Sequence, residues 1–252
     1  MAITHLLLDI EGTTCPVSFV AEVLFPYARR QLHAFLAANG SDPEVAQLVQ
    51  QVQEAWAADS APEAMQLLQS AASAGDIHTD PAAVVPYLQW LIDHDVKLTA
   101  LKDLQGRIWK AGYGSGELVA PLFPDVPEAL QRWHQQGYTL AVYSSGSVPA
   151  QQLLYAHSQA GDLRPLFSHW FDTRIGPKQR RESYQAIAAA MQVSAGEVLF
   201  ISDALSELLA ADAAGMPVLF SDREGNPARD SGSFERIHSY STLEPRHGNQ
   251  PA

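Results

Sequence analysis

Short apolar runs alternate with helical patterns in the two outer parts of the chain. Residues 3–10 are almost wholly apolar and contain Asp9 near their end, which is typical of a strand buried on both faces of a parallel sheet. The alternation returns after Val126, where strands are predicted at 138–143, 169–172, 198–202 and 217–220 with helices between them. Repeated strand–helix units predict an α/β fold with a doubly wound, Rossmann-like parallel sheet.

The stretch between the first strand and Gly112 carries only helical periodicity. Apolar residues recur at helical spacing in 20–27 and 45–52, and further amphipathic helices are predicted at 62–73, 81–93 and 96–110. A purely helical block inside an α/β pattern indicates an inserted domain. We therefore expect an α/β core of residues 1–18 and 118–245, a helical cap of residues 19–117 with a hinge at 112–116, and a flexible tail at 246–252.

The composition narrows the range of partners. The 252 residues are 46% hydrophobic, and 28 acidic against 16 basic side chains give a formal net charge of −12. Such a charge disfavours nucleic acids and anionic membranes, and a phosphorylated substrate would need local positive charge. The single cysteine, Cys15, excludes an internal disulfide and a multi-cysteine zinc site, and we expect it to be a small buried side chain.

Nothing in the pattern predicts a membrane segment. The first 14 residues lack a basic region, and their short apolar run meets Asp9 and Glu11, unlike a signal peptide. No later segment reaches about 18 uninterrupted apolar residues. We expect a cytoplasmic protein, and a monomer because no surplus exposed apolar helix stands out.

Two acidic residues follow the first predicted strand. In an open α/β sheet, ligands bind beyond the carboxyl ends of the strands. Asp9 and Glu11 are two positions apart, so an extended chain points both carboxylates to one side. One carboxylate is then able to act as a nucleophile while the other donates and accepts protons. A solvated strand end with a helix-capping acid is the alternative, since it gives the same pattern.

Hydroxyl, cationic and acidic residues mark the later strand ends. Ser144 and Ser145 lie between a buried strand and a helix, where they either hold an anion or cap the helix. Lys178 is placed at the start of a predicted helix, where a bound phosphate would explain a cation, and a solvent-facing lysine is the alternative. Asp203 ends a buried strand and either shares a divalent cation with Asp9 or caps a helix.

The order and spacing of these motifs resemble those of the haloacid dehalogenase superfamily, and more narrowly its enolase-phosphatase E1 family. The resemblance rests on DIEGTT at 9–14, YSSGS at 143–147, FDTRIGPK at 171–178, SDALSE at 202–207 and, in the helical block, LKDLQGRIWKAGY at 101–113. It covers most of the chain apart from the C-terminal tail. Glu11 stands where most of the superfamily has a second Asp, and this family carries D-x-E-G-T.

The resemblance implies a Mg²⁺-dependent enzyme of methionine salvage. Such an enzyme enolises 2,3-diketo-5-methylthiopentyl-1-phosphate and then hydrolyses the phosphate ester, giving the acireductone 1,2-dihydroxy-3-keto-5-methylthiopentene. Asp9 would be the nucleophile and form an aspartyl-phosphate, and Glu11 would supply acid and base catalysis. Asp203 would join Asp9 and Glu11 at the metal.

The same resemblance implies how the phosphate is held. Ser144, Ser145 and Lys178 would bind the phosphoryl oxygens, and Glu207 would orient Lys178 or a metal-bound water. A generic Mg²⁺-dependent small-molecule phosphatase of the superfamily is the alternative function. A non-catalytic phosphate-binding protein would be expected to lack part of this set, and a dehalogenase would not need Glu11 and Asp203.

Overall fold

The computed structural model describes residues 2–75, 80–227 and 229–245. The chain forms two compact units: residues 1–20 with 119–252, called the core unit, and residues 21–118, called the helical unit. The tail predicted at 246–252 lies outside the described residues.

The core unit is built on a parallel sheet, which among the described residues has six strands in the order β3-β2-β1-β4-β5-β6. The strands are β1 (His5–Leu8), β2 (Thr139–Tyr143), β3 (Phe167–Phe171), β4 (Val198–Ser202), β5 (Val218–Ser221) and β6 (Arg236–Ile237). In central β1, Leu6 pairs with Leu140 of β2 and Leu199 of β4. The predicted doubly wound parallel sheet is confirmed; the short β6 was not predicted, because two residues carry no periodic signal.

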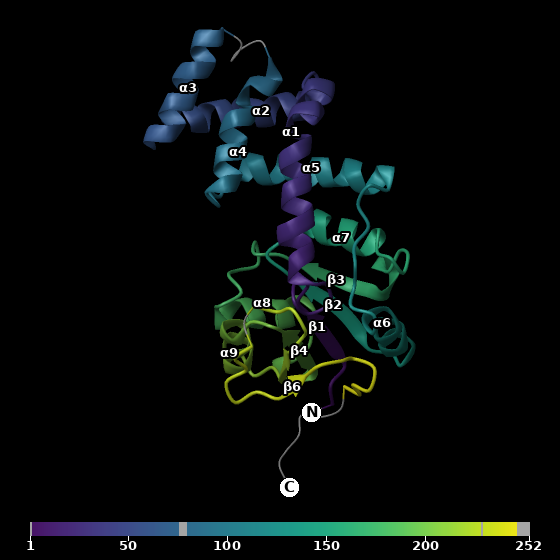
Figure 1. The fold of residues 1–252 in the computed structure, drawn as a ribbon. Coiled ribbons are helices and arrows are strands. Elements are labelled where there is room, and N and C mark those ends of the chain that lie inside the picture. Colours follow the sequence, from purple (N-terminus) through teal and green to yellow (C-terminus); the bar gives the residue numbers. More distant parts are fainter. Residues whose placement is uncertain (1, 76–79, 228, 246–252) are drawn as a thin grey trace. The chain divides into compact units, whose positions relative to one another are not determined.

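Helices cover both faces of the sheet, α8 and α9 on one side and α6 and α7 on the other (Figure 1). They are α6 (Val126–Gln135), α7 (Val148–Ala156), α8 (Arg181–Ala190) and α9 (Leu205–Ala213), with short 3₁₀ turns η3 (Arg164–Leu166) and η4 (Ala195–Glu197). Under α8 and α9, Tyr184, Ile187 and Leu208 pack on Phe200 of β4 in one buried cluster. Burial of these apolar faces fixes the sheet edge from which the site residues project.

The helical unit contains η1 (Phe19–Leu24), α1 (Phe25–Asn39), α2 (Pro43–Ala58), α3 (Pro62–Ala74), η2 (Pro81–Val84), α4 (Val85–Asp93) and α5 (Thr99–Ser115). Asp42 caps α2 by accepting hydrogen bonds from the backbone N–H groups of Glu44 and Val45. Trp56 stacks on Tyr87 with ring centroids 5.0 Å apart. The expected all-helical block is therefore present and has its own apolar core.

Most of the segment 112–116, which was predicted as a hinge, is helical. Gly112 to Ser115 form the last turn of α5, and Gly116 ends the helix at a φ of 78°. A Cβ on Gly112 would lie 2.6 Å from the Tyr27 hydroxyl, so this glycine permits a close approach of α1 and α5. Helix 81–93 also differs from the prediction, since η2 and α4 divide it.

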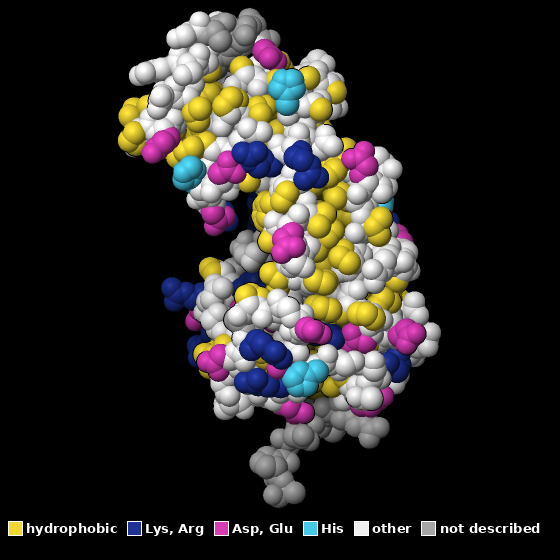
Figure 2. Space-filling model, viewed as in Figure 1, with side chains coloured by type: hydrophobic (Ala, Val, Ile, Leu, Met, Phe, Trp, Pro, Cys, Tyr) yellow, Lys and Arg dark blue, Asp and Glu magenta, His cyan; other side chains and the backbone are white. Residues whose placement is uncertain are grey.

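The surface and the buried residues bear on two further expectations, the absence of a membrane segment and the burial of Cys15. Among the helices of the described ranges, none combines the length and the apolar character needed to cross a bilayer. On the face shown in Figure 2, acidic and basic side chains are scattered among one another. Cys15 is fully buried, as predicted.

Candidate active site

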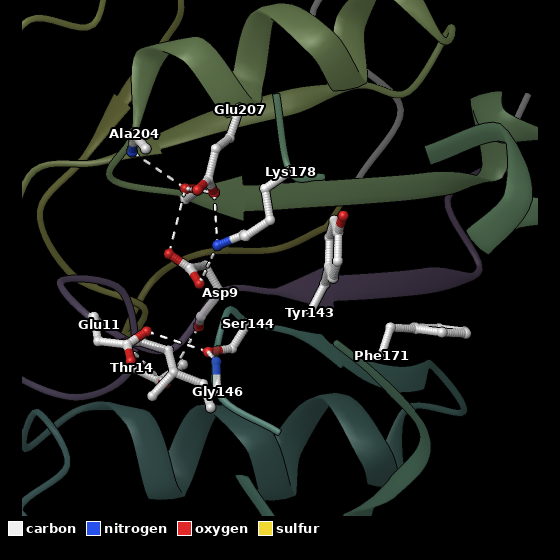
Figure 3. A network of polar contacts seen from close by, with 12 residues as sticks. Asp9, Glu11, Thr14, Tyr143, Ser144, Gly146, Phe171, Lys178, Ala204 and Glu207 are labelled. Carbon is white, nitrogen blue, oxygen red and sulfur yellow. Dashed lines mark hydrogen bonds and ion pairs between the residues drawn. The ribbon is translucent and has the colours of Figure 1, made fainter. Parts of the chain in front are cut away.

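The side chains predicted to carry chemistry lie where strands of the core unit end (Figure 3). Asp9 follows β1, Ser144 follows β2, and Asp203 follows β4. Lys178 comes from the loop before α8, and Glu207 from the first turn of α9. Since β1 lies between β2 and β4, the parallel topology brings these strand ends to one edge of the sheet.

Lys178 lies between two carboxylates. Its Nζ is 2.6 Å from Oδ1 of Asp9 and 2.7 Å from Oε2 of Glu207, and its side chain is only 4% exposed. Burial by itself lowers the pKa of Lys178, but the Asp9 and Glu207 carboxylates more than offset this and raise the pKa above its ordinary value. The ammonium is therefore charged at neutral pH and supplies the positive charge that an anionic ligand requires.

The expectation that Lys178 opens a helix is wrong, because α8 begins only at Arg181. The turn before α8 is held by a hydrogen bond from the Arg180 N–H to the Pro177 carbonyl, and by the Tyr184 hydroxyl donating to the Lys178 carbonyl over 2.8 Å. The placement of Lys178 is thus explained by its carboxylate partners and not by a helix dipole.

Ser202, the last residue of β4, was not among the predicted site residues. Its hydroxyl donates to Oε2 of Glu207 over 2.9 Å, lies 3.5 Å from Oδ2 of Asp9, and accepts the backbone N–H of Ala204. Ser202 therefore joins the Asp9–Lys178–Glu207 network through both of its carboxylates. The sequence signals for Ser202 were its position beside Asp203 at the end of a buried strand and its place at the start of the SDALSE motif.

Glu11 and Ser144 face each other from the ends of β1 and β2. The Ser144 hydroxyl donates to Oε2 of Glu11 over 3.3 Å and accepts the Gly146 N–H over 3.1 Å. Burial and the nearby Asp9 carboxylate raise the pKa of Glu11. Ser144 is not the cap of α7, because Ser147 occupies that position, and Ser145 is exposed.

Asp203 adds another acid to this edge. Burial and the Asp9 carboxylate raise the pKa of Asp203 to about 7. The same two causes raise the pKa of Glu207 to about 7, against the opposing effect of Lys178. The helix-cap alternative for Asp203 does not hold, since Ala204 occupies the cap position of α9. Asp9 and Glu207 contact Lys178, and the further acids Glu11 and Asp203 add negative charge that this lysine does not balance.

The arrangement of these acids bears on whether they can hold a metal ion. Within the described ranges, no three His, Cys, Asp or Glu side chains form a ready-made metal cage. Mg²⁺ does not require such a cage, since one or two carboxylates suffice when water and substrate oxygens complete its shell. The carboxylates of buried Asp9 and of half-buried Glu11 and Asp203 are the hard oxygen donors that Mg²⁺ prefers, and a cation would relieve their mutual repulsion. The residues present therefore fit a magnesium ion.

Gly12 permits the close approach of the first and fourth strand ends. Its φ is 68°, and a Cβ there would lie 2.1 Å from Oδ2 of Asp203. No side chain larger than hydrogen fits between the turn after β1 and this carboxylate.

We expect Gly12→Ala to lower the free energy of unfolding by about 1–3 kcal/mol through backbone strain, and further through the clash with Asp203. Gly137→Ala is the matched control, because Gly137 has a φ of 88° but a Cβ added there would meet no atom within 4 Å. Urea unfolding of both variants measures the difference. An equal loss in the two would contradict the close approach at Gly12.

The comparisons with known proteins agree on the family to which the chain is similar. The model of the haloacid dehalogenase-like hydrolase family matches residues 3–215. Enolase-phosphatase E1 of Synechococcus sp. (strain RCC307) is 51% identical over 234 residues, covering 93% of this chain and 91% of that protein. Enolase-phosphatase E1 of Synechococcus elongatus is 49% identical over 243 residues, covering 96% of this chain and 98% of that protein.

A solved structure extends the likeness to three dimensions. The crystal structure of the UTR4 protein from Saccharomyces cerevisiae superposes with a TM-score of 0.71 at 34% sequence identity. The match covers 96% of this chain and 100% of the yeast chain. The similarity therefore includes the helical unit as well as the core unit.

Proposed function

The chain belongs to the haloacid dehalogenase-like hydrolases and, within them, to the enolase-phosphatase E1 family, and from this premise we propose how its residues divide the chemistry. It is an acireductone synthase, a phosphatase of methionine salvage. Its substrate is 2,3-diketo-5-methylthiopentyl-1-phosphate and its product is 1,2-dihydroxy-3-keto-5-methylthiopentene. The observation that supports the division of roles best is the buried Asp9–Lys178–Glu207 network beside Glu11.

Asp9 is the proposed nucleophile. Lys178 holds Oδ1 of Asp9 at 2.6 Å, while the contact of Oδ2 with the Ser202 hydroxyl is longer, at 3.5 Å. A carboxylate oxygen attacks phosphorus, the bond from phosphorus to the ester oxygen breaks, and an aspartyl-phosphate forms. Water then attacks phosphorus, which releases inorganic phosphate and restores the carboxylate.

Glu11 is the proposed acid in the formation of the aspartyl-phosphate and the proposed base in its hydrolysis. Burial and the Asp9 carboxylate raise the pKa of Glu11 and so favour its protonated form, and we propose that this proton passes to the departing ester oxygen. The resulting carboxylate then takes a proton from the attacking water. For the preceding enolisation, we propose that ionised Glu11 takes a proton from the carbon next to the ketone and passes it to the ketone oxygen, so that the C–H bond pair becomes the C=C bond of the enol.

Lys178, Ser144 and Ser145 are the proposed phosphate ligands. An ammonium group has three donors, and Asp9 and Glu207 occupy two of those on Lys178, so one remains for a phosphoryl oxygen. The Ser144 hydroxyl lies beside Glu11 at the same edge. Glu207 orients the ammonium, because it holds Nζ from the side away from Asp9.

A magnesium ion completes the proposal. Asp9, Glu11 and Asp203 would hold it, and when bound it would offset the negative charge of substrate and carboxylates and polarise the oxygens it contacts. We further propose that the protein acts as a cytoplasmic monomer on this small phosphorylated substrate. Its net charge of −12 favours the absence of nucleic acid or an anionic membrane as a partner.

The test is a paired assay on the purified protein, with enol absorbance and inorganic phosphate followed together. We expect both signals from the diketo phosphate in the presence of Mg²⁺, and loss of both after EDTA treatment with recovery on adding Mg²⁺. Phosphate release from other phosphomonoesters without turnover of the diketone would instead favour the generic phosphatase. Turnover that survives EDTA would contradict the metal assignment.

A further inference from the structure

The turn that follows β1 is held by side chains from far along the chain. The carbonyl of Gly12 accepts hydrogen bonds from the Ser221 hydroxyl over 3.1 Å and from the Asn226 side-chain amide over 2.9 Å. The carbonyl of Thr13 accepts one from the Tyr240 hydroxyl over 3.1 Å. All three donors lie beyond residue 215, where the match to the hydrolase family model ends.

Asn226 is the most directly placed of these donors. Its Nδ2 lies between the carbonyls of Gly12, at 2.9 Å, and of Ser221, at 3.3 Å, so this atom must be the donor end of the amide. The residue is only 7% exposed. A Cβ on Gly12 would lie 2.9 Å from this Nδ2 as well as 2.1 Å from Oδ2 of Asp203, so Asn226 and Asp203 crowd the same glycine.

Tyr240 supports the adjoining peptide group. Its ring is fully buried and lies 5.3 Å from the Trp133 ring and 4.2 Å from the Arg223 guanidinium carbon, measured to ring centroids. Because packing fixes the ring, the hydroxyl that reaches Thr13 is fixed as well. None of the three donor side chains is proposed to touch the substrate. Their hydrogen bonds hold the turn that joins Asp9 and Glu11 to the rest of the core unit.

We infer that Asn226, assisted by Tyr240, is a positioning residue that sets the turn carrying Asp9 and Glu11 against Asp203. A buried carbonyl that loses its donor turns toward another partner, and displacement of a reacting group by about 1 Å costs roughly 100-fold in rate. The inference rests on the proposed roles of Asp9 and Glu11. It assigns to the C-terminal segment a part in the reaction that the D-x-E-G-T motif by itself does not contain.

The experiment compares Asn226→Asp with Asn39→Asp in the full-length protein. Aspartate has the shape of asparagine but offers oxygens to the Gly12 and Ser221 carbonyls, so the hydrogen bonds are replaced by repulsion. Asn39 lies at an exposed position of α1, where its side-chain amide donates to the Phe35 carbonyl one turn away, which makes it the matched control. We expect Asn226→Asp to lower kcat about 10- to 100-fold with KM changed less than about twofold, and Asn39→Asp to leave both unchanged.

Tyr240→Phe is the second variant, since it removes one hydroxyl and keeps the buried ring. We expect it to lower kcat about three- to tenfold, the effect of one lost hydrogen bond, at a temperature where circular dichroism shows a fully folded protein. Wild-type kcat in Tyr240→Phe, or in folded Asn226→Asp, would overturn the inference.

Hydrogen exchange gives a readout that needs no catalysis. The amides of Thr13, Thr14 and Cys15 all bond the Ile10 carbonyl inside the turn, and we expect Asn226→Asp to speed their exchange while Asn39→Asp does not. Unchanged exchange in Asn226→Asp would overturn the inference even if the wild-type protein released no phosphate. If the wild-type protein shows no turnover but the amides exchange faster in Asn226→Asp, the proposed function is refuted, and the support of the turn by Asn226 stands.

Discussion

Asp9→Asn is expected to abolish phosphate release, with kcat lowered by at least about 10⁴-fold, while the protein remains folded. The amide keeps the shape of the side chain and still offers an oxygen to Lys178 at the position now 2.6 Å from Nζ. It carries no negative charge and does not form an acyl phosphate. Neutralising Asp9 also removes a cause of the raised pKa values of Glu11 and Asp203, so the folded state loses one ion pair and several repulsions.

Three measurements check this result. Single-turnover phosphate release gives the rate, circular dichroism and urea unfolding report the fold, and acid-quenched protein shows whether a phosphoryl group is attached. Asp212→Asn, at an exposed position of α9, is the control for changing an aspartate in the same unit. Phosphate release at the wild-type rate from Asp9→Asn would refute the nucleophile assignment.

Lys178→Met is expected to damage both catalysis and stability. Methionine retains most of the buried volume but leaves the Asp9 and Glu207 carboxylates without the ammonium that now lies 2.6 and 2.7 Å from them. Removing one partner of a buried ion pair costs about 3–5 kcal/mol of unfolding free energy. Loss of the proposed phosphate contact lowers kcat/KM by about 10²–10³-fold as well.

Urea unfolding and phosphate release at one pH measure the two effects. The control is Lys110→Met at an exposed position of α5, for which we expect less than about 0.5 kcal/mol of change. Adding Glu207→Gln to Lys178→Met removes one unpaired carboxylate, so the double variant should regain part of the stability but none of the activity. A double variant less stable than Lys178→Met would show that the unpaired charge of Glu207 is not the cause.

Much of the fold followed from periodicity. The strand predicted at 198–202 coincides with β4, because a short, wholly apolar run bounded by polar residues is typical of a buried strand in a parallel sheet. Helix bounds were close where a proline marks the first turn, as in α3 and α6. The extension of α5 through 111–115 was not predicted, because a glycine that permits helix packing and a glycine that bends the chain look the same in sequence.

For the site, the sequence by itself determined which residue types stand at the strand ends. Alternating strands and helices force a parallel sheet, and a parallel sheet places the ends that carry Asp9, Ser144 and Asp203 at one edge, so these residues were found before any contact was known. The family was also readable, because its motifs are short, local and ordered along the chain.

Only the tertiary structure decided which of these groups contact one another. The bonds from Lys178 to Asp9 and from Asn226 to Gly12 join residues 169 and 214 positions apart, and no local pattern specifies such pairs. Ser202 and Asn226 have the ordinary appearance of strand-end and turn residues. They acquire a role because folding buries polar groups that must then find partners, and the packing of the whole core unit selects those partners.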